Sequence, residues 1–146
     1  MTAHDNIVTM RTIIERLNGG DIKAVAQHVS EDFTRHDLSG AFLAGQAGRS
    51  EVTDFLHALY ASIPDLRIDI ADIFACDNKV TVRYEFSGTH KGHLLGIAPT
   101  GRKLDFSGIN IYRFEEGRIA EAWQLWDWAT VLQQVGALSR TSGGGR

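Results

Sequence analysis

The side chains best suited to acid–base chemistry in this sequence are His36 and Asp127. His36 lies in a short segment, residues 33–37, that we expect to be extended and to cross the mouth of a pocket, and imidazole titrates near neutral pH. Asp127 closes the last expected strand between two tryptophans, where its carboxyl group would be placed for proton transfer. The alternative for Asp127 is structural, as a cap for the helix that follows. Both residues are candidate catalytic groups.

Two histidines and one cysteine raise the question of metal or redox chemistry. His90 and His93 have a spacing that can serve metals, but no third ligand lies nearby in the sequence, so we expect no metal site. Cys76 has no second cysteine with which to form an internal disulfide, and we expect it to be a small residue at a strand end. A lone thiol fits a reducing compartment, which predicts a cytoplasmic protein.

The composition is that of an ordinary globular protein. The 146 residues carry a formal net charge of −3 and the 15 basic residues are scattered, so we expect no nucleic-acid partner. The sequence shows neither a long apolar run nor a signal-peptide pattern, and we expect no membrane association. No GxGxxG or Walker loop is present in the sequence, which predicts chemistry without a nucleotide, and we expect no cofactor of any kind.

Three helices are expected in the first half of the chain. Apolar residues recur at three- and four-residue spacing within residues 5–17, 22–29 and 52–63, the pattern of amphipathic helices. Asn-Gly-Gly at residues 18–20 ends the first helix, and Pro64 ends the third. The small, Gly-rich stretch of residues 39–48 is expected to be a loop.

The second half of the chain is expected to be a β-meander. From Leu66 the apolar period changes to two, with alternating runs at 80–87, 104–114 and 118–128 and turns at 77–79 and 115–117. A chain with helices first and an antiparallel meander afterwards has the pattern of the α+β class. The sheet must bury one face, and the N-terminal helices are available to cover it. We therefore expect a curved antiparallel sheet wrapped around these helices, with a cavity at its open end. Residues 1–138 are expected to form this domain, and residues 139–146 are predicted to be a disordered tail.

The last strand has two faces, and the face that lines the cavity decides the mechanism. One face carries Ala120, Ala122, Gln124 and Trp126, and the other carries Ile119, Glu121, Trp123, Leu125 and Asp127. On the strand before it, Arg113 is expected to pair with Glu121 across the sheet. Flat apolar area for an aromatic or terpenoid-like ligand is expected from five residues, although core packing is the default role of such side chains: Trp123, Trp126, Trp128, Phe106 and Tyr84.

Several segments of the second half are similar to a known family. GTHKGHLLGIAPTGRK at residues 88–103 is followed by IYRFEEGRIAEAW at 111–123, LWDW at 125–128 and LQQVG at 132–136. Together they resemble the SnoaL-like polyketide cyclases, or ester cyclases, of the nuclear transport factor 2-like superfamily, from the first helix to Gly136. The resemblance implies a cone-shaped α+β barrel, chemistry without a cofactor, and association of subunits through the sheet.

The resemblance also implies an intramolecular aldol condensation, but three positions depart from the family's pattern. The aldol cyclases carry an acid–base aspartate after the EAW-like segment, where this chain has Gln124. On the preceding strand they carry a histidine and, two residues before it, a glutamine, where this chain has Asn110 and Gly108. Because an amide cannot titrate, Gln124 and Asn110 are expected to hold an enolate or carbonyl oxygen, or only to satisfy a buried strand face. His36, near a point where many family members carry a histidine, or Asp127 then remains as the base.

From these residues we expect a cofactor-independent cyclase or isomerase, of the lyase or isomerase class, acting on a hydrophobic polycyclic or polyketide-like carbonyl compound. The alternatives are a hydrolase or hydroxylase relative, in which Gln124 and Asp127 would position water, and a non-catalytic module that binds small molecules. This fold hosts many functions, so the reaction depends on the site. A homodimer or homotetramer is expected, because Ile109, Ile111 and Leu125 would lie exposed on the convex face.

Overall fold

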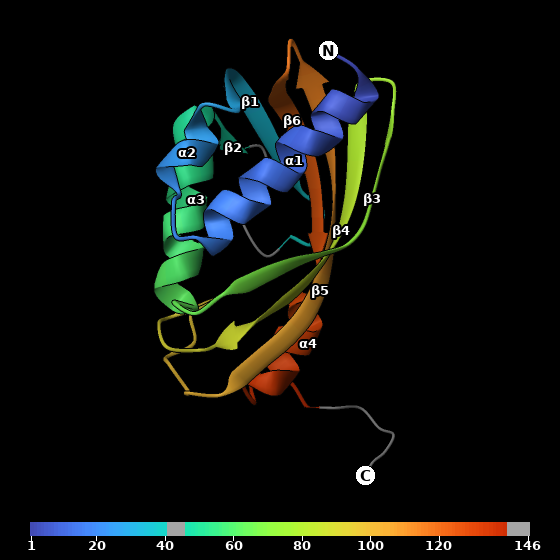
Figure 1. Cartoon of the computed structure of the whole chain (residues 1–146). Helices are drawn as coiled ribbons and strands as arrows, with labels where there is room; N and C mark the ends of the chain where they lie inside the picture. The colour runs from blue at the N-terminus through green and yellow to red at the C-terminus, as the bar shows by residue number, and fades with distance from the viewer. Residues whose placement is uncertain (41–45, 140–146) are drawn as a thin grey trace.

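The computed structural model describes residues 1–40 and 46–139 (Figure 1). Four helices are present in this part: α1 (Ala3–Asn18), α2 (Lys23–Ala26), α3 (Arg49–Ser62) and α4 (Trp128–Gln134). The strands are β1 (Val29–Asp37), β2 (Gln46–Ala47), β3 (Arg67–Cys76), β4 (Lys79–Thr89), β5 (Lys103–Glu115) and β6 (Arg118–Trp126). The predicted α+β class is confirmed, with helices first and the meander afterwards.

Helix α1 begins and ends where its sequence signals place it. Thr2 and Asp5 form a capping box, in which the Asp5 N–H donates to Thr2 Oγ1 at 3.1 Å and the Thr2 N–H donates to Asp5 Oδ2 at 2.9 Å. The helix buries a stripe on one side, made of Met10, Ile13, Ile14 and Leu17. Its last residue, Asn18, exchanges two hydrogen bonds with the backbone of Ile68, at 2.8 and 2.9 Å. These bonds fix the end of α1 against β3.

The sheet has the strand order β2-β1-β6-β5-β4-β3. Strands β3 to β6 are antiparallel neighbours, as the hairpin turns predicted. Strand β1 pairs with the other edge of β6 in parallel, with His36 opposite Trp123 and Asp37 opposite Gln124. This parallel pairing departs from the expected all-antiparallel sheet, because β1 and β6 are not joined by a hairpin and all of α3 to β5 lies between them in the chain.

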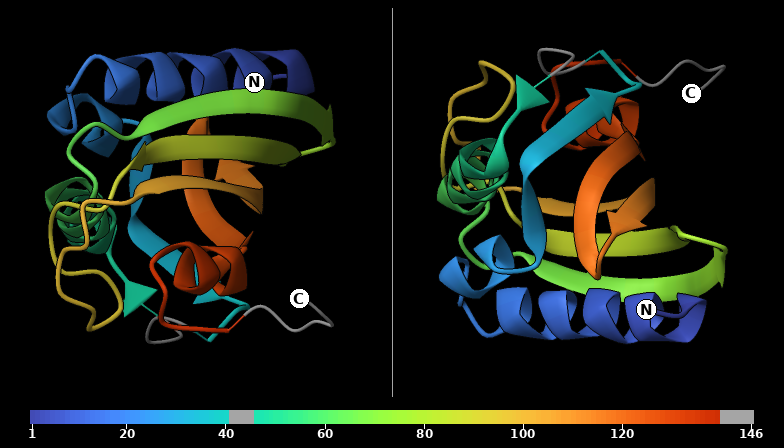
Figure 2. Two further views of the ribbon diagram at one scale, coloured as in Figure 1. Left: turned by 90° about the horizontal axis from the view of Figure 1, so that it is seen from below. Right: turned by 90° about the horizontal axis from the view of Figure 1, so that it is seen from above.

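The curled sheet and the helices enclose one apolar core. Figure 2 shows α1 alongside β3, α3 across the opening of the curled sheet, and α4 at the far end of the meander. The arrangement confirms the expected curved sheet wrapped around N-terminal helices. The expected loop at residues 39–48 contains the short strand β2, and its residues 41–45 lie outside the described part. Of the predicted tail, residues 140–146 also lie outside it.

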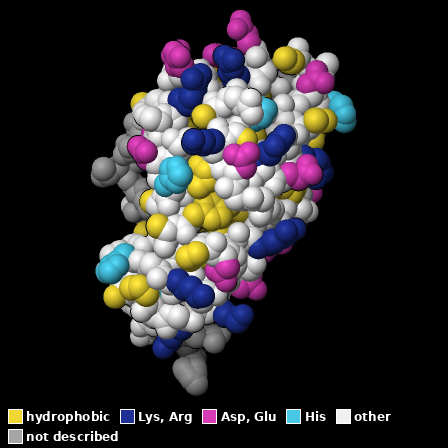
Figure 3. All heavy atoms as spheres, turned by 60° about the vertical axis from the view of Figure 1, so that its left-hand side comes forward, with side chains coloured by type: hydrophobic (Ala, Val, Ile, Leu, Met, Phe, Trp, Pro, Cys, Tyr) yellow, Lys and Arg dark blue, Asp and Glu magenta, His cyan; other side chains and the backbone are white. Residues whose placement is uncertain are grey.

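The surface mixes charges of both signs. Figure 3 shows a face on which Lys and Arg side chains are interspersed with Asp and Glu, around a central strip of hydrophobic side chains. That face therefore presents no patch of a single charge. Within the described residues, no helix is long and apolar enough to cross a membrane.

Candidate functional site

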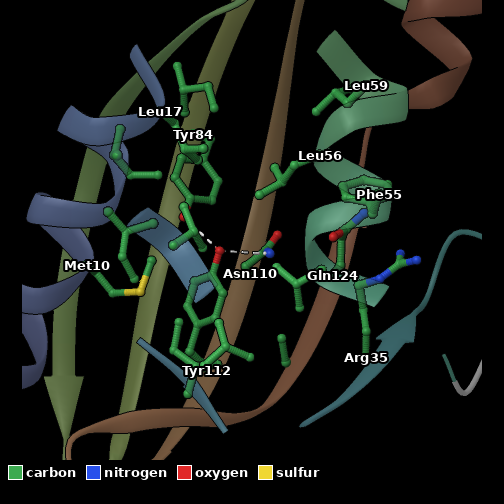
Figure 4. Close-up of a pocket in the computed structure, with 18 of the residues that line it drawn as sticks. Met10, Leu17, Arg35, Phe55, Leu56, Leu59, Tyr84, Asn110, Tyr112 and Gln124 are labelled. Atoms are coloured by element: carbon green, nitrogen blue, oxygen red, sulfur yellow. Dashed lines mark hydrogen bonds between the residues drawn. The ribbon is translucent and has the colours of Figure 1, made fainter. Parts of the chain in front are cut away.

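A cavity of about 90 Å³ lies between α1, α3 and the concave face of the sheet (Figure 4). Its walls are largely apolar, with Met10 and Ile14 from α1 and Phe55 and Leu56 from α3. Seven side chains bring polar atoms to this lining: Arg35, Glu51, Tyr84, Asn110, Tyr112, Gln124 and, through its indole N–H, Trp126. The cavity therefore combines apolar walls with a few convergent polar groups, the usual character of a small-molecule site.

Four residues of the sheet form a relay of hydrogen bonds along one wall. The indole N–H of Trp126 donates to Asn110 Oδ1 at 2.8 Å, and Asn110 Nδ2 donates to the Tyr112 hydroxyl at 3.0 Å. The Tyr112 and Tyr84 hydroxyl oxygens are 2.7 Å apart. Period-two alternation aligns these side chains on one face, since Asn110 and Tyr112 are two apart on β5 and Asn110 is opposite Gln124 on β6.

One of the two phenol hydroxyl hydrogens is not used in the hydrogen bond between Tyr84 and Tyr112. Tyr84 and Tyr112 carry two hydroxyl hydrogens between them, and one of these serves their mutual bond. Neither hydroxyl has another acceptor among the described residues, because Asn110 acts as a donor to Tyr112. Burial raises the pKa of Tyr112 to about 12 and that of Tyr84 well above its ordinary value. Both phenols are therefore neutral at pH 7, and one offers a hydrogen to the cavity.

Gln124 adds a second unused donor to the same cavity. The residue is 2% exposed, and no group of the described residues accepts a hydrogen bond from Nε2. Its backbone is fixed, because its carbonyl accepts from the Leu38 N–H at 2.8 Å. Figure 4 shows the side chain beside Phe55, on the side of the cavity opposite the two tyrosines. A buried amide donor without a partner is costly in a folded protein, and a ligand atom would satisfy it.

A cluster of buried charges lies at the end of the cavity where α3 begins. The Arg35 side chain is 7% exposed and donates through Nε to Glu51 Oε1 at 2.9 Å, and its Nη2 also donates to that oxygen. The guanidinium carbon lies 4.4 Å from the centre of the Phe55 ring. Asp37, whose side chain is fully buried, places Oδ2 4.0 Å from Arg35 Nη1 and accepts from the Ser39 N–H. One guanidinium thus faces two carboxylates.

The predicted aromatic residues divide between the cavity, the core behind it, which also holds Trp128, and the outer face of the sheet, where Trp123 stacks on His36. Tyr84 and Trp126 line the cavity, as expected. Phe106 is buried but stacks on Phe86, with ring centres 4.9 Å apart, and does not line it. Gly108 leaves the room that Trp126 needs, because a Cβ atom at Gly108 would lie 2.4 Å from Trp126 Cδ1. This glycine is one of the three positions that depart from the aldol cyclase pattern.

The expectation that His36 enters the cavity is wrong. Strand β1 alternates with Arg35 and Asp37 buried on the inner side, so His36 points to the outer face of the sheet. There its ring stacks on Trp123 at 5.4 Å, and Nε2 lies 2.7 Å from Glu121 Oε2. Glu121 also accepts from Arg113 at 3.0 Å, which confirms that expected ion pair. His36 therefore belongs to a surface cluster of charges and has no contact with the cavity.

Asp127 also lies outside the cavity. Its carboxylate caps α4, where Oδ1 accepts from the Thr130 N–H at 3.0 Å and Oδ2 accepts from the Thr130 hydroxyl at 2.5 Å. The structural alternative for Asp127 is the one found, because β6 ends at Trp126 and its next residue turns outward into the helix. The pairing of Gln124 with Asp127 that would position water is not formed.

His90 and His93 do not form a metal site in the described part of the chain. His90 is fully buried, and its Nδ1 lies 2.9 Å from the Thr100 hydroxyl. Residues 1–40 and 46–139 contain no group of three or more His, Cys, Asp or Glu side chains placed to hold a metal ion.

Three polar cavity residues were not predicted from the sequence as site residues. Tyr112, Arg35 and Glu51 all line the cavity. For Arg35 a signal existed: apolar Phe33 two residues earlier is a core residue, and a period of two from Phe33 places Arg35 inside and His36 outside. Glu51 has no such signal, because its place depends on how α3 docks against β1.

The comparisons with known proteins agree on the family and the fold. The family model of the SnoaL-like polyketide cyclases matches residues 7–135. The structure is similar to that of AclR, a proposed hydroxylase from Streptomyces galilaeus, with a TM-score of 0.84 and 19% identity over 97% of this chain and 87% of that one. A proposed SnoaL-like polyketide cyclase from Jannaschia sp. CCS1 also gives a TM-score of 0.84, with 18% identity over 94% of this chain and 95% of its own.

A third structure is more similar in sequence. IdmH, a proposed polyketide cyclase from Streptomyces antibioticus, has a TM-score of 0.78 and 27% identity over 90% of this chain and 98% of that one. None of the curated proteins matches the sequence. The family match runs from within α1 to the end of α4 and so includes every element that lines the cavity. The chain therefore belongs to the SnoaL-like polyketide cyclase family and has its nuclear transport factor 2-like fold.

Proposed function

We propose that this protein binds a hydrophobic carbonyl compound in the cavity and catalyses proton transfer next to the carbonyl group, leading to cyclisation or isomerisation. One observation carries the proposal: in an apolar cavity, Gln124 Nε2 and one hydroxyl of the Tyr84–Tyr112 pair are donors without an acceptor among the described residues. A carbonyl oxygen is the group that such donors complement, since it accepts two hydrogen bonds and carries no charge into the apolar walls.

The same donors favour the reactive form of the substrate over its ground state. Removal of a proton next to a carbonyl moves negative charge onto the oxygen, and preorganised donors stabilise that charge more strongly than the neutral carbonyl. Because burial raises the pKa of both phenols, they stay protonated and remain donors. Loss of one such donor typically costs about 10²–10³ in rate.

The volume of the cavity limits the substrate to a small ring system unless its side chains move. At about 90 Å³ it is smaller than the apolar cavity of about 150 Å³ that binds benzene in another protein. A polycyclic substrate would need the apolar side chains of α1 and α3 to shift, or would place only one ring inside. We therefore propose a ligand whose buried part is one carbonyl-bearing ring.

The test uses 1-indanone, a ketone with one aromatic ring, in deuterated buffer containing EDTA. We expect saturable binding by NMR titration and exchange of the protons next to the carbonyl at a rate above that of buffer. Binding without exchange would refute proton transfer and favour the non-catalytic binding module. Neither binding nor exchange, with this ketone or a monocyclic analogue, would refute the site as a carbonyl pocket. Exchange that EDTA abolishes and a metal ion restores would contradict chemistry by the chain's own side chains.

A further inference from the structure

The proposed reaction needs a group that accepts the proton, and the sheet supplies none. Besides the indole of Trp126, the polar side chains that β4, β5 and β6 bring to the cavity are two neutral phenols and two amides, from Tyr84, Tyr112, Asn110 and Gln124. His36 and Asp127, the bases expected from the sequence, lie outside the cavity. The proton acceptor must therefore come from another wall.

We infer that Glu51, on α3, is the proton acceptor of this site. The inference rests on the proposed function and assigns a residue to its central step. Glu51 is the one carboxylate among the described residues that line the cavity. Asp37 is the nearest rival, but its side chain is fully buried beside Arg35, it accepts hydrogen bonds from Ser39, and it does not line the cavity.

The two oxygens of Glu51 have different surroundings. Oε1 accepts both hydrogen bonds from Arg35, whereas Oε2 is buried and has no hydrogen-bond donor among the described residues. The side chain is 10% exposed, so bulk water does not readily replace the missing partner. A carboxylate with one oxygen anchored and the other unused is held in orientation and keeps lone pairs for a proton.

Arg35 makes this orientation rigid. Its guanidinium is packed over the Phe55 ring at 4.4 Å and lies 4.0 Å from Asp37. Glu51 itself stands in the first turn of α3, where its backbone N–H donates to the Gly48 carbonyl at 3.1 Å. Arg35 is a positioning residue in this scheme, because it acts on the substrate only through the carboxylate.

The step balances within the site. Glu51 Oε2 takes a proton from the carbon next to the carbonyl, and the electrons of the broken C–H bond form the C=C bond of an enolate. The negative charge moves to the substrate oxygen, where Gln124 Nε2 and the spare phenol hydroxyl donate to it. The protonated carboxyl group then returns a proton to carbon, or a deuteron after it has exchanged with deuterated solvent, and is a carboxylate again.

The test compares variants in the exchange assay with 1-indanone. Glu51→Gln keeps the shape of the side chain and an oxygen that accepts from Arg35, but removes the basic oxygen, and should lower the exchange rate by about 10²–10⁴-fold while binding remains. Glu51→Ala should be similarly slow and should recover with added formate, in proportion to the formate concentration, because the small carboxylate replaces the lost one. A merely structural role would give no such recovery.

Glu121→Gln is the matched control. Glu121 is also an ion-paired carboxylate, but it lies on the outer face of the sheet with His36 and Arg113. Its exchange rate should equal that of the unmodified protein. If Glu51→Gln does not fold, Glu51→Ala takes its place, because it too keeps Arg35 beside the buried Asp37 carboxylate, and it is expected to bind but not to exchange without formate. Full exchange in Glu51→Gln, or in Glu51→Ala without formate, overturns the assignment but leaves the proposed function standing. Absence of exchange in the unmodified protein instead refutes the proposed function.

Discussion

Replacement of Gln124 by methionine should make the protein more stable and less active. Gln124 is 2% exposed, and its Nε2 donor has no acceptor among the described residues. An unsatisfied buried donor costs about 1–3 kcal/mol, and methionine has a similar length and no donor. A change of shape in the core costs up to about 1.5 kcal/mol, so the net gain in the free energy of unfolding should be about 1 kcal/mol. For a domain of this size, the melting temperature would rise by about 2–4 °C.

The same change should lower the rate of 1-indanone exchange by about 10²–10³-fold, because it removes one donor to the substrate oxygen. Stability is measured by urea unfolding followed by tryptophan fluorescence, and exchange by NMR. Gln133→Met, on α4 and away from the cavity, is the control and should change the free energy of unfolding by no more than about 0.5 kcal/mol.

Two results would contradict the role assigned to Gln124. If Gln124→Met lowers the free energy of unfolding by 1 kcal/mol or more, on the order of a lost buried hydrogen bond, Gln124 has a structural partner. If exchange persists at the original rate, the amide does not contact the reacting oxygen. Gln124→Glu separates length from charge, since it keeps the length of the side chain but replaces the donor by a carboxyl group.

Three further perturbations test the core packing behind the site, the ion pairs on the outer face of the sheet and the oligomeric state. Gly108→Ala should lower the free energy of unfolding in urea by about 1–3 kcal/mol, because the new Cβ would lie 2.4 Å from Trp126 Cδ1; an unchanged value would contradict this close packing. Hydrogen bonds from His36 and then Arg113 lower the pKa of Glu121, so their small contribution to stability should be present above pH 4.5 and lost below it. Glu121→Gln should flatten that part of the stability–pH curve, and an unchanged curve would refute the coupling. Leu125 is 52% exposed on the outer face, and light scattering should show a homodimer or larger assembly that Leu125→Asp weakens; a 16.1 kDa species in the unmodified protein would refute it.

Much of the fold could be predicted because its elements are specified locally. The amphipathic stripe of α1 and the alternation of β4 to β6 each lie within about a dozen neighbouring residues, and the turns between the strands fix their antiparallel pairing. The parallel pairing of β1 with β6 has no such local cause. It joins segments separated by more than 80 residues in the chain, so only the assembled sheet determines it.

The site residues that local patterns specify could likewise be predicted, and those that depend on tertiary contacts could not. Tyr84, Asn110, Gln124 and Trp126 were predicted as site residues and do line the cavity, because strand alternation and hairpin register bring them to one face. The titration range of imidazole makes His36 a candidate base, whereas the alternation of β1 directs its side chain outward. No local pattern singles out Glu51, because its contact with Arg35 depends on how α3 docks onto β1.

The separation of donors and carboxylate on two walls has a physical reason. A carboxylate at position 124 would only accept hydrogen bonds, so the sheet would lose the unused Nε2 donor of Gln124. With an amide at that place, the sheet keeps its donors for the substrate oxygen. The carboxylate on α3 is instead anchored by Arg35 through a single oxygen, which leaves the other oxygen for a proton. Glutamine at position 124 is thus compatible with acid–base chemistry in this cavity, provided that the base comes from the helix.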